Sequence, residues 1–359
     1  MSNPLLINLA VLFDRPTGIA TYAQNIINSL NSLQPILLSA QTFPGFKQYA
    51  IADNMSPAQG TKGHLRRLLW TQFQLPQIYR ELQADLIYSP IPEAPLYSQT
   101  RYVVMAHDLI PLRFPRQTSP LTNYFRYVVP SVLHQAEHII CNSQATASDL
   151  NKYYGIAAHK ITSILLGYDT ANFYPRDQAS DTQSPYFLYL GRQDPYKNLT
   201  GLIKAFAAFP DQDYHLAIAG STDPRFTPKL QQQAEELGIT NRIQWLNYLS
   251  YQELPVVISN AVALVLPTFW EGFGLPVLEA MACGTPVITS NLASLPEITG
   301  DAAILINPDD IQAITLAMID LSQDTVMRSQ LRQLSIKQAQ KFSWKKTGTA
   351  TKEVLAKYL

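Results

Sequence analysis

Short apolar runs alternate with helical patterns along most of the chain, and this alternation limits the possible folds more than any other feature. The first apolar run covers residues 5–12, and apolar residues from Ile19 to Leu33 then recur at the spacing of one helix face. Repeated strand–helix units favour parallel pairing, because a parallel strand is reached through a crossover that is usually helical. The sequence therefore predicts an α/β protein with parallel sheets.

Two series of these units occur, separated by a polar segment. The first series places further strands near 36–40, 85–89, 102–106 and 138–141, and the second near 186–190, 215–219, 242–246, 262–266 and 286–289. The segment 171–185 between them is rich in Asp, Gln, Ser and Pro and has little apolar periodicity. We predict two Rossmann-like domains, residues 1–170 and 186–341, joined by a linker at 171–185.

The composition shows no strong charge bias. Of the 359 residues, 47% are apolar and the formal net charge is zero, so no general basic surface for nucleic acid is expected. No basic N-terminal segment leads into a long apolar run, and no apolar stretch reaches the roughly 18 residues of a membrane span. We expect a cytoplasmic protein, at most peripheral at the inner face of a membrane.

The run Glu271-Gly-Phe-Gly-Leu-Pro-Val-Leu-Glu279 follows an expected strand and leads into a helix. Pro276 would lie in the first helical turn, where a missing N–H has no consequence. This loop would lie at the carboxyl end of a buried strand, where open α/β sheets bind ligands. The helix start offers N–H groups to an anion, and Gly272 and Gly274 allow close approach of the backbone.

A second run, Gly191-Arg192-Gln-Asp-Pro-Tyr-Lys197-Asn198, directly follows the strand expected at 186–190. Arg192 and Lys197 would therefore lie at the carboxyl end of another strand. A guanidinium can bind two phosphate oxygens at once, and an ammonium adds a point charge. Two cations close to a helix N-terminus suit a diphosphate.

These two runs, in this order and about 80 residues apart, resemble those of glycosyltransferase family 4. The resemblance implies the GT-B fold, in which two Rossmann-like domains face each other across a cleft. A C-terminal helix, here 342–359, would cross back to the N-terminal domain. The resemblance also implies retaining transfer of a hexose, with a lean to mannose from GDP-mannose, in polysaccharide biosynthesis. The acceptor would be a hydroxyl of a glycan or lipid-linked glycan.

The resemblance implies catalytic roles for four residues. Arg192 and Lys197 match cations that bind the donor diphosphate and neutralise its charge as it leaves. Glu271 matches a residue that contacts hydroxyls of the transferred sugar. His107 follows the strand expected at 102–106 and matches a histidine near the donor sugar, although a lone histidine is most often structural.

Donor-binding roles are implied for a further set. Glu279 matches a glutamate that accepts hydrogen bonds from the ribose hydroxyls, and the backbone near Phe273, Gly274 and Leu275 would assist. Gly191 belongs to the loop that carries Arg192.

Gly18 ends the loop that begins at Asp14. Relatives commonly carry two adjacent glycines here, approaching donor phosphate and acceptor. This chain has Thr17-Gly18 instead, so a simple βα turn stays open as an alternative for Gly18.

Metal and cofactor sites are not expected. Asp211-Gln-Asp213 matches a D-x-D pattern, but it would lie at the amino end of a strand, so a solvated loop is expected. We predict metal-independent catalysis, with the nucleoside diphosphate sugar as donor substrate and no cofactor. A nucleotide-sugar 2-epimerase and a non-catalytic nucleotide-sugar-binding protein stay open as alternatives.

The segment 62–73 mixes basic and aromatic residues, including Lys62, Arg66, Trp70 and Phe73. It could contact an anionic membrane that carries a lipid-linked acceptor. An ordinary amphipathic helix that packs on the domain is the alternative.

Overall fold

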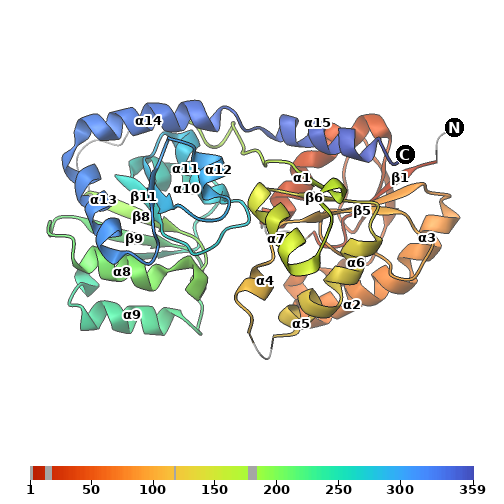
Figure 1. The fold of residues 1–359 in the computed structure, drawn as a ribbon, viewed down its shortest axis with the longest axis horizontal. Coiled ribbons are helices and arrows are strands. Elements are labelled where there is room, and N and C mark those ends of the chain that lie inside the picture. The colour runs from red at the N-terminus through yellow and green to blue at the C-terminus, as the bar shows by residue number, and fades with distance from the viewer. Residues whose placement is uncertain (1–2, 13–17, 117–118, 177–183) are drawn as a thin grey trace. The chain divides into compact units, whose positions relative to one another are not determined.

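The computed structural model describes residues 3–12, 18–116, 119–176 and 184–359. The chain divides into two compact units, the first formed by Met1–Gly167 with Trp344–Leu359 and the second by Tyr168–Ser343. Each unit contains one parallel sheet with helices on both faces (Figure 1). The α/β prediction with two Rossmann-like domains is therefore confirmed.

In the described residues, the first unit has a seven-stranded sheet in the order β3-β2-β1-β4-β5-β6-β7, and all its pairs are parallel. The direction of winding reverses between β1 and β4. The strands are β3 (Lys47–Ala50), β2 (Ile36–Ser39), β1 (Leu5–Asn8), β4 (Leu86–Ser89), β5 (Tyr102–Ala106), β6 (His138–Cys141) and β7 (Ile161–Ser163).

Helices α1 and α15 pack against each other on one face of this sheet, and α2, α5 and α6 cover the other (Figure 1). Local signals set the helix ends: the Ser143 hydroxyl accepts the Thr146 N–H at 3.0 Å before α7, and Gly155 ends that helix at a φ of 66°. The helices are α1 (Gly18–Leu30), α2 (Gly60–Phe73), α3 (Leu75–Glu81), α4 (Ile110–Arg113), α5 (Pro120–Tyr127), α6 (Val129–Gln135), α7 (Gln144–Tyr154) and α15 (Trp344–Leu355), with short 3-10 helices at Asn31–Leu33, Asp53–Met55, Pro57–Gln59 and Ala158–Lys160.

The second unit has a six-stranded parallel sheet in the order β10-β9-β8-β11-β12-β13. Here the winding reverses between β8 and β11. The strands are β10 (Ile243–Asn247), β9 (His215–Ala219), β8 (Tyr186–Leu190), β11 (Ala263–Leu266), β12 (Val287–Ser290) and β13 (Ile304–Ile306).

Helices α8 and α9 lie on one face of the second sheet, and α10, α11, α12 and α14 lie on the other (Figure 1). The helices are α8 (Leu199–Ala207), α9 (Thr227–Glu236), α10 (Leu254–Asn260), α11 (Leu275–Cys283), α12 (Leu295–Thr299), α13 (Ile311–Gln323) and α14 (Thr325–Ala339), with 3-10 helices at Pro195–Lys197 and Thr240–Arg242.

Two glycines bring the ends of β8 and β9 into close contact. Gly220 follows β9, and a Cβ atom there would lie 2.0 Å from the carbonyl oxygen of Gly191, which follows β8. The Gly220 N–H is also bonded to the Asn247 carbonyl at 2.7 Å. A larger residue would therefore displace the backbone beside Arg192.

We expect Gly220→Ala to lower the free energy of unfolding by about 1–3 kcal/mol because a methyl group must enter occupied space. For a unit of this size the melting temperature would fall by roughly 2–12 °C, which thermal denaturation measures. Gly238→Ala is the control: its φ is 70°, but nothing lies within 4 Å of the added Cβ. Equal losses in both variants would show that backbone strain, not the Gly191 contact, sets the effect.

Candidate functional site

The two motif loops of the second unit lie at the same edge of its sheet. β8 and β11 are neighbours, with Phe187 opposite Ala263 and Leu188 opposite Leu264. Because all strands run in parallel, the loops that follow β8 and β11 both leave from their carboxyl ends. The winding reverses between these strands, and open α/β sheets bind ligands at such a point.

Backbone hydrogen bonds tie the two loops together. The Tyr196 carbonyl accepts the Phe269 N–H at 2.8 Å and the Thr268 hydroxyl at 3.0 Å. Below them, the Tyr189 hydroxyl donates to the Arg192 carbonyl at 2.5 Å. The loop backbones that carry Arg192 and Glu271 are therefore held by groups on the strands and on each other.

Lys197 and Glu271 form an ion pair between the two loops, and each is largely buried, with side chains 11% and 9% exposed. The Lys197 ammonium donates to the Glu271 carboxylate. Removing one partner of a buried pair leaves an uncompensated charge and typically costs about 3–5 kcal/mol. The structure therefore brings together two of the residues that the sequence selects.

Arg192 lies at the surface, with 73% of its side chain exposed, and its Nε is 2.8 Å from Oδ2 of the buried Asp194. A guanidinium carries five N–H donors, so this ion pair leaves donors available for an anion. Asp194 thus orients an exposed cation.

The start of α11 offers N–H groups to a ligand. Within the described residues, the amides of Phe273, Gly274 and Leu275 donate to no acceptor. Gly274 caps the helix at a φ of 103°, and a Cβ there would lie 2.8 Å from the Leu295 side chain. The Ser294 hydroxyl lies 3.0 and 2.7 Å from the carbonyls of Glu271 and Phe273. This geometry suits an anion at the helix N-terminus.

Glu279 lies in the second turn of α11 and is partly buried. Burial raises the pKa of its carboxyl from 4.5 to about 8. In the part of the chain that the structure describes, no hydrogen bond or ion pair involves this carboxyl. Glu279 is therefore mainly protonated at neutral pH in the free protein.

His107 follows β5 in the first unit. Its Nε2 lies 2.9 Å from the Pro90 carbonyl, so this nitrogen carries the proton and Nδ1 is an acceptor. The Tyr22 ring packs edge-on at 5.1 Å. Burial lowers the His107 pKa to about 4, so the ring is neutral at pH 7. Gly18 is the first residue of α1, and the rest of its predicted loop, 14–17, lies outside the described residues.

Several side chains that hold the two motif loops in place were not predicted from the sequence. Asp194 could have been found, because it lies two residues after Arg192. Tyr189 and Ser294 have no local signal, since each acts through a hydroxyl that reaches a loop carbonyl. Side chains that support a loop from a distance follow from the fold rather than from spacing.

Asp211 and Asp213 lie in the turn before β9, where the Asp213 N–H bonds the Asp211 carboxylate at 3.0 Å. Both side chains are exposed. In the described part of the chain, no three His, Cys, Asp or Glu side chains gather in a way that could hold a metal ion.

Two family models match the chain in succession. The model for Glycosyltransferase Family 4 matches residues 16–172, and the model for Glycosyl transferases group 1 matches residues 171–341.

Two O-antigen chain mannosyltransferases are similar to this chain along most of their length. The O-antigen chain mannosyltransferase RfbU of Salmonella typhimurium is 26% identical over 330 residues, covering 89% of this chain and 91% of that protein. The O-antigen chain mannosyltransferase B of Escherichia coli is 28% identical over 367 residues, covering 93% and 94%.

Solved structures show the same fold. Sucrose-phosphate synthase from Thermosynechococcus elongatus matches with a TM-score of 0.78 and 18% identity, over 99% of this chain and 98% of that one. Anabaena HepE in complex with UDP and glucose matches with a TM-score of 0.76 and 19% identity, over 98% and 99%. At these identities the likeness concerns the fold alone.

The raised pKa of Glu279 predicts how stability depends on pH. The unfolded chain loses this proton near pH 4.5, whereas the folded protein keeps it until about pH 8. Between these values the unfolded state binds fewer protons, so this group lowers stability as pH rises. Glu279→Gln removes that effect. We expect the melting temperature of the variant, relative to the wild type, to increase from pH 5 to pH 8. A difference that does not change with pH would contradict the assignment.

Proposed function

The chain belongs to glycosyltransferase family 4, and we propose that it transfers a hexose from a nucleoside diphosphate sugar to a hydroxyl of a glycan or lipid-linked glycan. The observation that carries this proposal is the Lys197–Glu271 pair, which lies at the carboxyl ends of β8 and β11. The exposed Arg192 follows β8 in the same loop. Glycosyl transfer is the activity of the family, whereas the donor, the stereochemistry and the acceptor are our inferences.

The donor diphosphate is the proposed ligand of the cations and the helix N-terminus. Arg192 can bind phosphate oxygens through its unused N–H donors, and Lys197 adds a fixed positive charge. The amides near Gly274 are proposed to bind the same anion. Negative charge develops on the diphosphate as the sugar leaves, so these donors stabilise the transition state more than the ground state.

The two glutamates are proposed to bind hydroxyl groups of the donor. Glu271, held by Lys197, is proposed to accept hydrogen bonds from the transferred sugar. Glu279 is proposed to bind the ribose hydroxyls, which would supply the donors that its carboxyl lacks in the free protein. Hydrogen bonds from a ligand favour the ionised form and would lower the pKa of Glu279 from about 8.

We propose retention of configuration and catalysis without a metal ion. In this scheme the leaving phosphate takes the proton of the acceptor hydroxyl on the face that the donor leaves, and the protein orients the reactants. His107 is proposed to contact the donor sugar through Nδ1, its acceptor nitrogen. The similarity to two O-antigen chain mannosyltransferases supports mannose as the sugar and GDP-mannose as the first donor to test.

A peripheral membrane contact through α2 is proposed for a lipid-linked acceptor, with the enzyme on the cytoplasmic side. Leu65, Leu69 and Phe73 of this helix are 57%, 51% and 68% exposed. The basic Lys62 and Arg66 are exposed beside them, and such a combination suits an anionic lipid surface. None of the described helices is long and apolar enough to cross a membrane.

The transferase proposal predicts release of one nucleoside diphosphate from a panel of sugar nucleotides, GDP-mannose first, with an acceptor glycan and with EDTA present. Arg192→Ala should lower kcat/KM by about 10- to 100-fold, because a charge-assisted hydrogen bond contributes roughly 1.5–3 kcal/mol. Lys229→Ala is the control, since this lysine is exposed on α9 of the same unit.

Three outcomes would count against this scheme. Interconversion of the sugar without an acceptor would indicate an epimerase. Donor binding without release under every condition would indicate a binding protein. Loss of activity in EDTA would show that a metal ion is required.

The membrane contact predicts binding of the protein to phosphatidylglycerol vesicles, weakened by salt because exposed charges are screened. Leu65→Ser with Leu69→Ser should reduce this binding by at least about 10-fold, since two leucines lose a lipid contact. Leu316→Ser is the matched control, because Leu316 is 49% exposed on α13. Cosedimentation with the vesicles measures this binding. Equal binding of the wild type, the double variant and the Leu316 variant would exclude this role for α2.

A further inference from the structure

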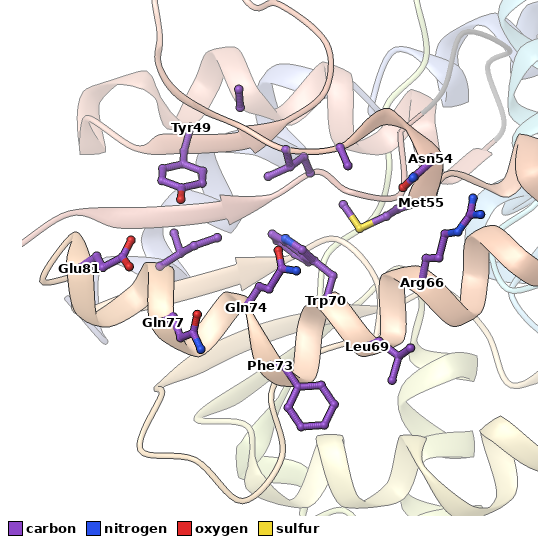
Figure 2. Close-up of a pocket in the computed structure, with 14 residues that line it drawn as sticks. Tyr49, Asn54, Met55, Arg66, Leu69, Trp70, Phe73, Gln74, Gln77 and Glu81 are labelled. Carbon is purple, nitrogen blue, oxygen red and sulfur yellow. The ribbon is translucent and has the colours of Figure 1, made fainter.

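The first unit contains a groove of about 770 Å³ that the donor-binding residues do not use. It lies between the end of β3, the segment that follows it, and the helices α2 and α3 (Figure 2). Tyr49 lines it from β3, Leu69, Trp70 and Phe73 line it from α2, and Gln77 lines it from α3, with Gln74 between the two helices. The groove therefore shares Leu69 and Phe73 with the exposed apolar residues of α2 that are proposed to contact a membrane.

The groove combines aromatic rings with amide side chains. Tyr49 and Trp70 supply flat apolar surface, and Asn54, Gln74 and Gln77 each carry a donor and an acceptor on one amide. A sugar presents apolar C–H groups on its ring faces and hydroxyls, which both donate and accept, at its edge. The lining therefore matches both parts of a sugar.

The polar groups of the groove are available to a ligand. Within the described residues, the side-chain amides of Asn54, Gln74 and Gln77 form no hydrogen bond with the protein. The charged lining residues are Arg66 and Glu81, whose charges cancel. A polyanion such as a lipid headgroup cluster or a nucleic acid would find no net positive charge here, whereas a neutral glycan needs none.

The wall of the groove is held in place by a buried ion pair. Arg67, 5% exposed, donates to both carboxylate oxygens of Glu93 at 2.6 and 2.8 Å, and it also donates to the Met55 carbonyl at 2.9 Å. Met55 lines the groove. The segment after β3 is therefore fixed before a ligand arrives, which reduces the entropy lost on binding.

We propose that this groove binds the already assembled sugars of a neutral glycan acceptor, several units from the reacting hydroxyl. The acceptor role rests on the proposed transferase function, whereas glycan binding in the groove does not. The segment 51–55 follows β3, so it lies at the carboxyl edge of the sheet, as does His107 after β5. Four strand spacings separate β3 from β5, or about 19 Å. A glycan of several sugars spans that distance, and a single sugar does not.

The test is calorimetric titration of the full chain with linear mannose oligosaccharides of increasing length and with mannose alone. We expect binding that strengthens with length. Gln74→Ala and Gln77→Ala should each weaken it by about 2- to 10-fold, because one hydrogen bond contributes roughly 0.5–1.5 kcal/mol. Gln231→Ala is the matched control, as an exposed glutamine on α9 that forms no side-chain hydrogen bond with the described residues.

Nucleoside diphosphate release from GDP-mannose is measured in parallel to separate the two proposals. Release with no oligosaccharide binding, or with binding that the two variants leave unchanged, would overturn the groove proposal and leave the transferase standing. Oligosaccharide binding that the variants weaken, without release from any donor, would overturn the transferase and keep the groove. Loss of phosphatidylglycerol vesicle binding in the two variants, with oligosaccharide binding intact, would assign the groove to lipid instead.

Discussion

The ion pair between Lys197 and Glu271 joins two loops that are distant in the sequence but leave neighbouring strands. Both charges are largely removed from water, so a shift of either loop would leave a buried charge without its partner. Because the pair has no net charge, the proposed attraction of an anionic donor falls to the exposed Arg192 on the same loop. The ion pair fixes the position of the Lys197 ammonium and offsets part of its positive charge.

Two further groups are kept neutral until a ligand arrives. Burial raises the pKa of Glu279 to about 8 and lowers that of His107 to about 4, so neither carries charge at pH 7 in the free protein. The Glu279 carboxyl has no hydrogen-bond partner among the described residues, so it gains most from a ligand that supplies hydrogen bonds. The free protein is thus less stable at this position than it could be, and a bound ligand would recover that free energy.

The sequence was sufficient for β5, β6, β8 and β9, which have the predicted bounds, because these strands are apolar and mostly buried. The missed strands, β3, β7 and β13, are all edge strands of three or four residues, where one side of the strand lacks a partner and the apolar pattern is short. At the site, motif spacing found Lys197 and Glu271, but not that they bond to each other. Their contact depends on β8 and β11 becoming neighbours, which is a property of the topology.

Helix α2 connects features that no local pattern relates. Its buried Arg67 binds Glu93 in the segment after β4, and in the same segment the Pro90 carbonyl accepts a hydrogen bond from the His107 Nε2–H. The same guanidinium fixes Met55 in the wall of the groove. A glycan bound in the groove would therefore contact Met55, whose carbonyl is bonded to Arg67, and Arg67 also binds Glu93 in the segment that contacts His107. The Arg67 bonds to Glu93 and Met55 are buried and charge-assisted, so one guanidinium holds both the groove wall and the segment that accepts the His107 hydrogen bond.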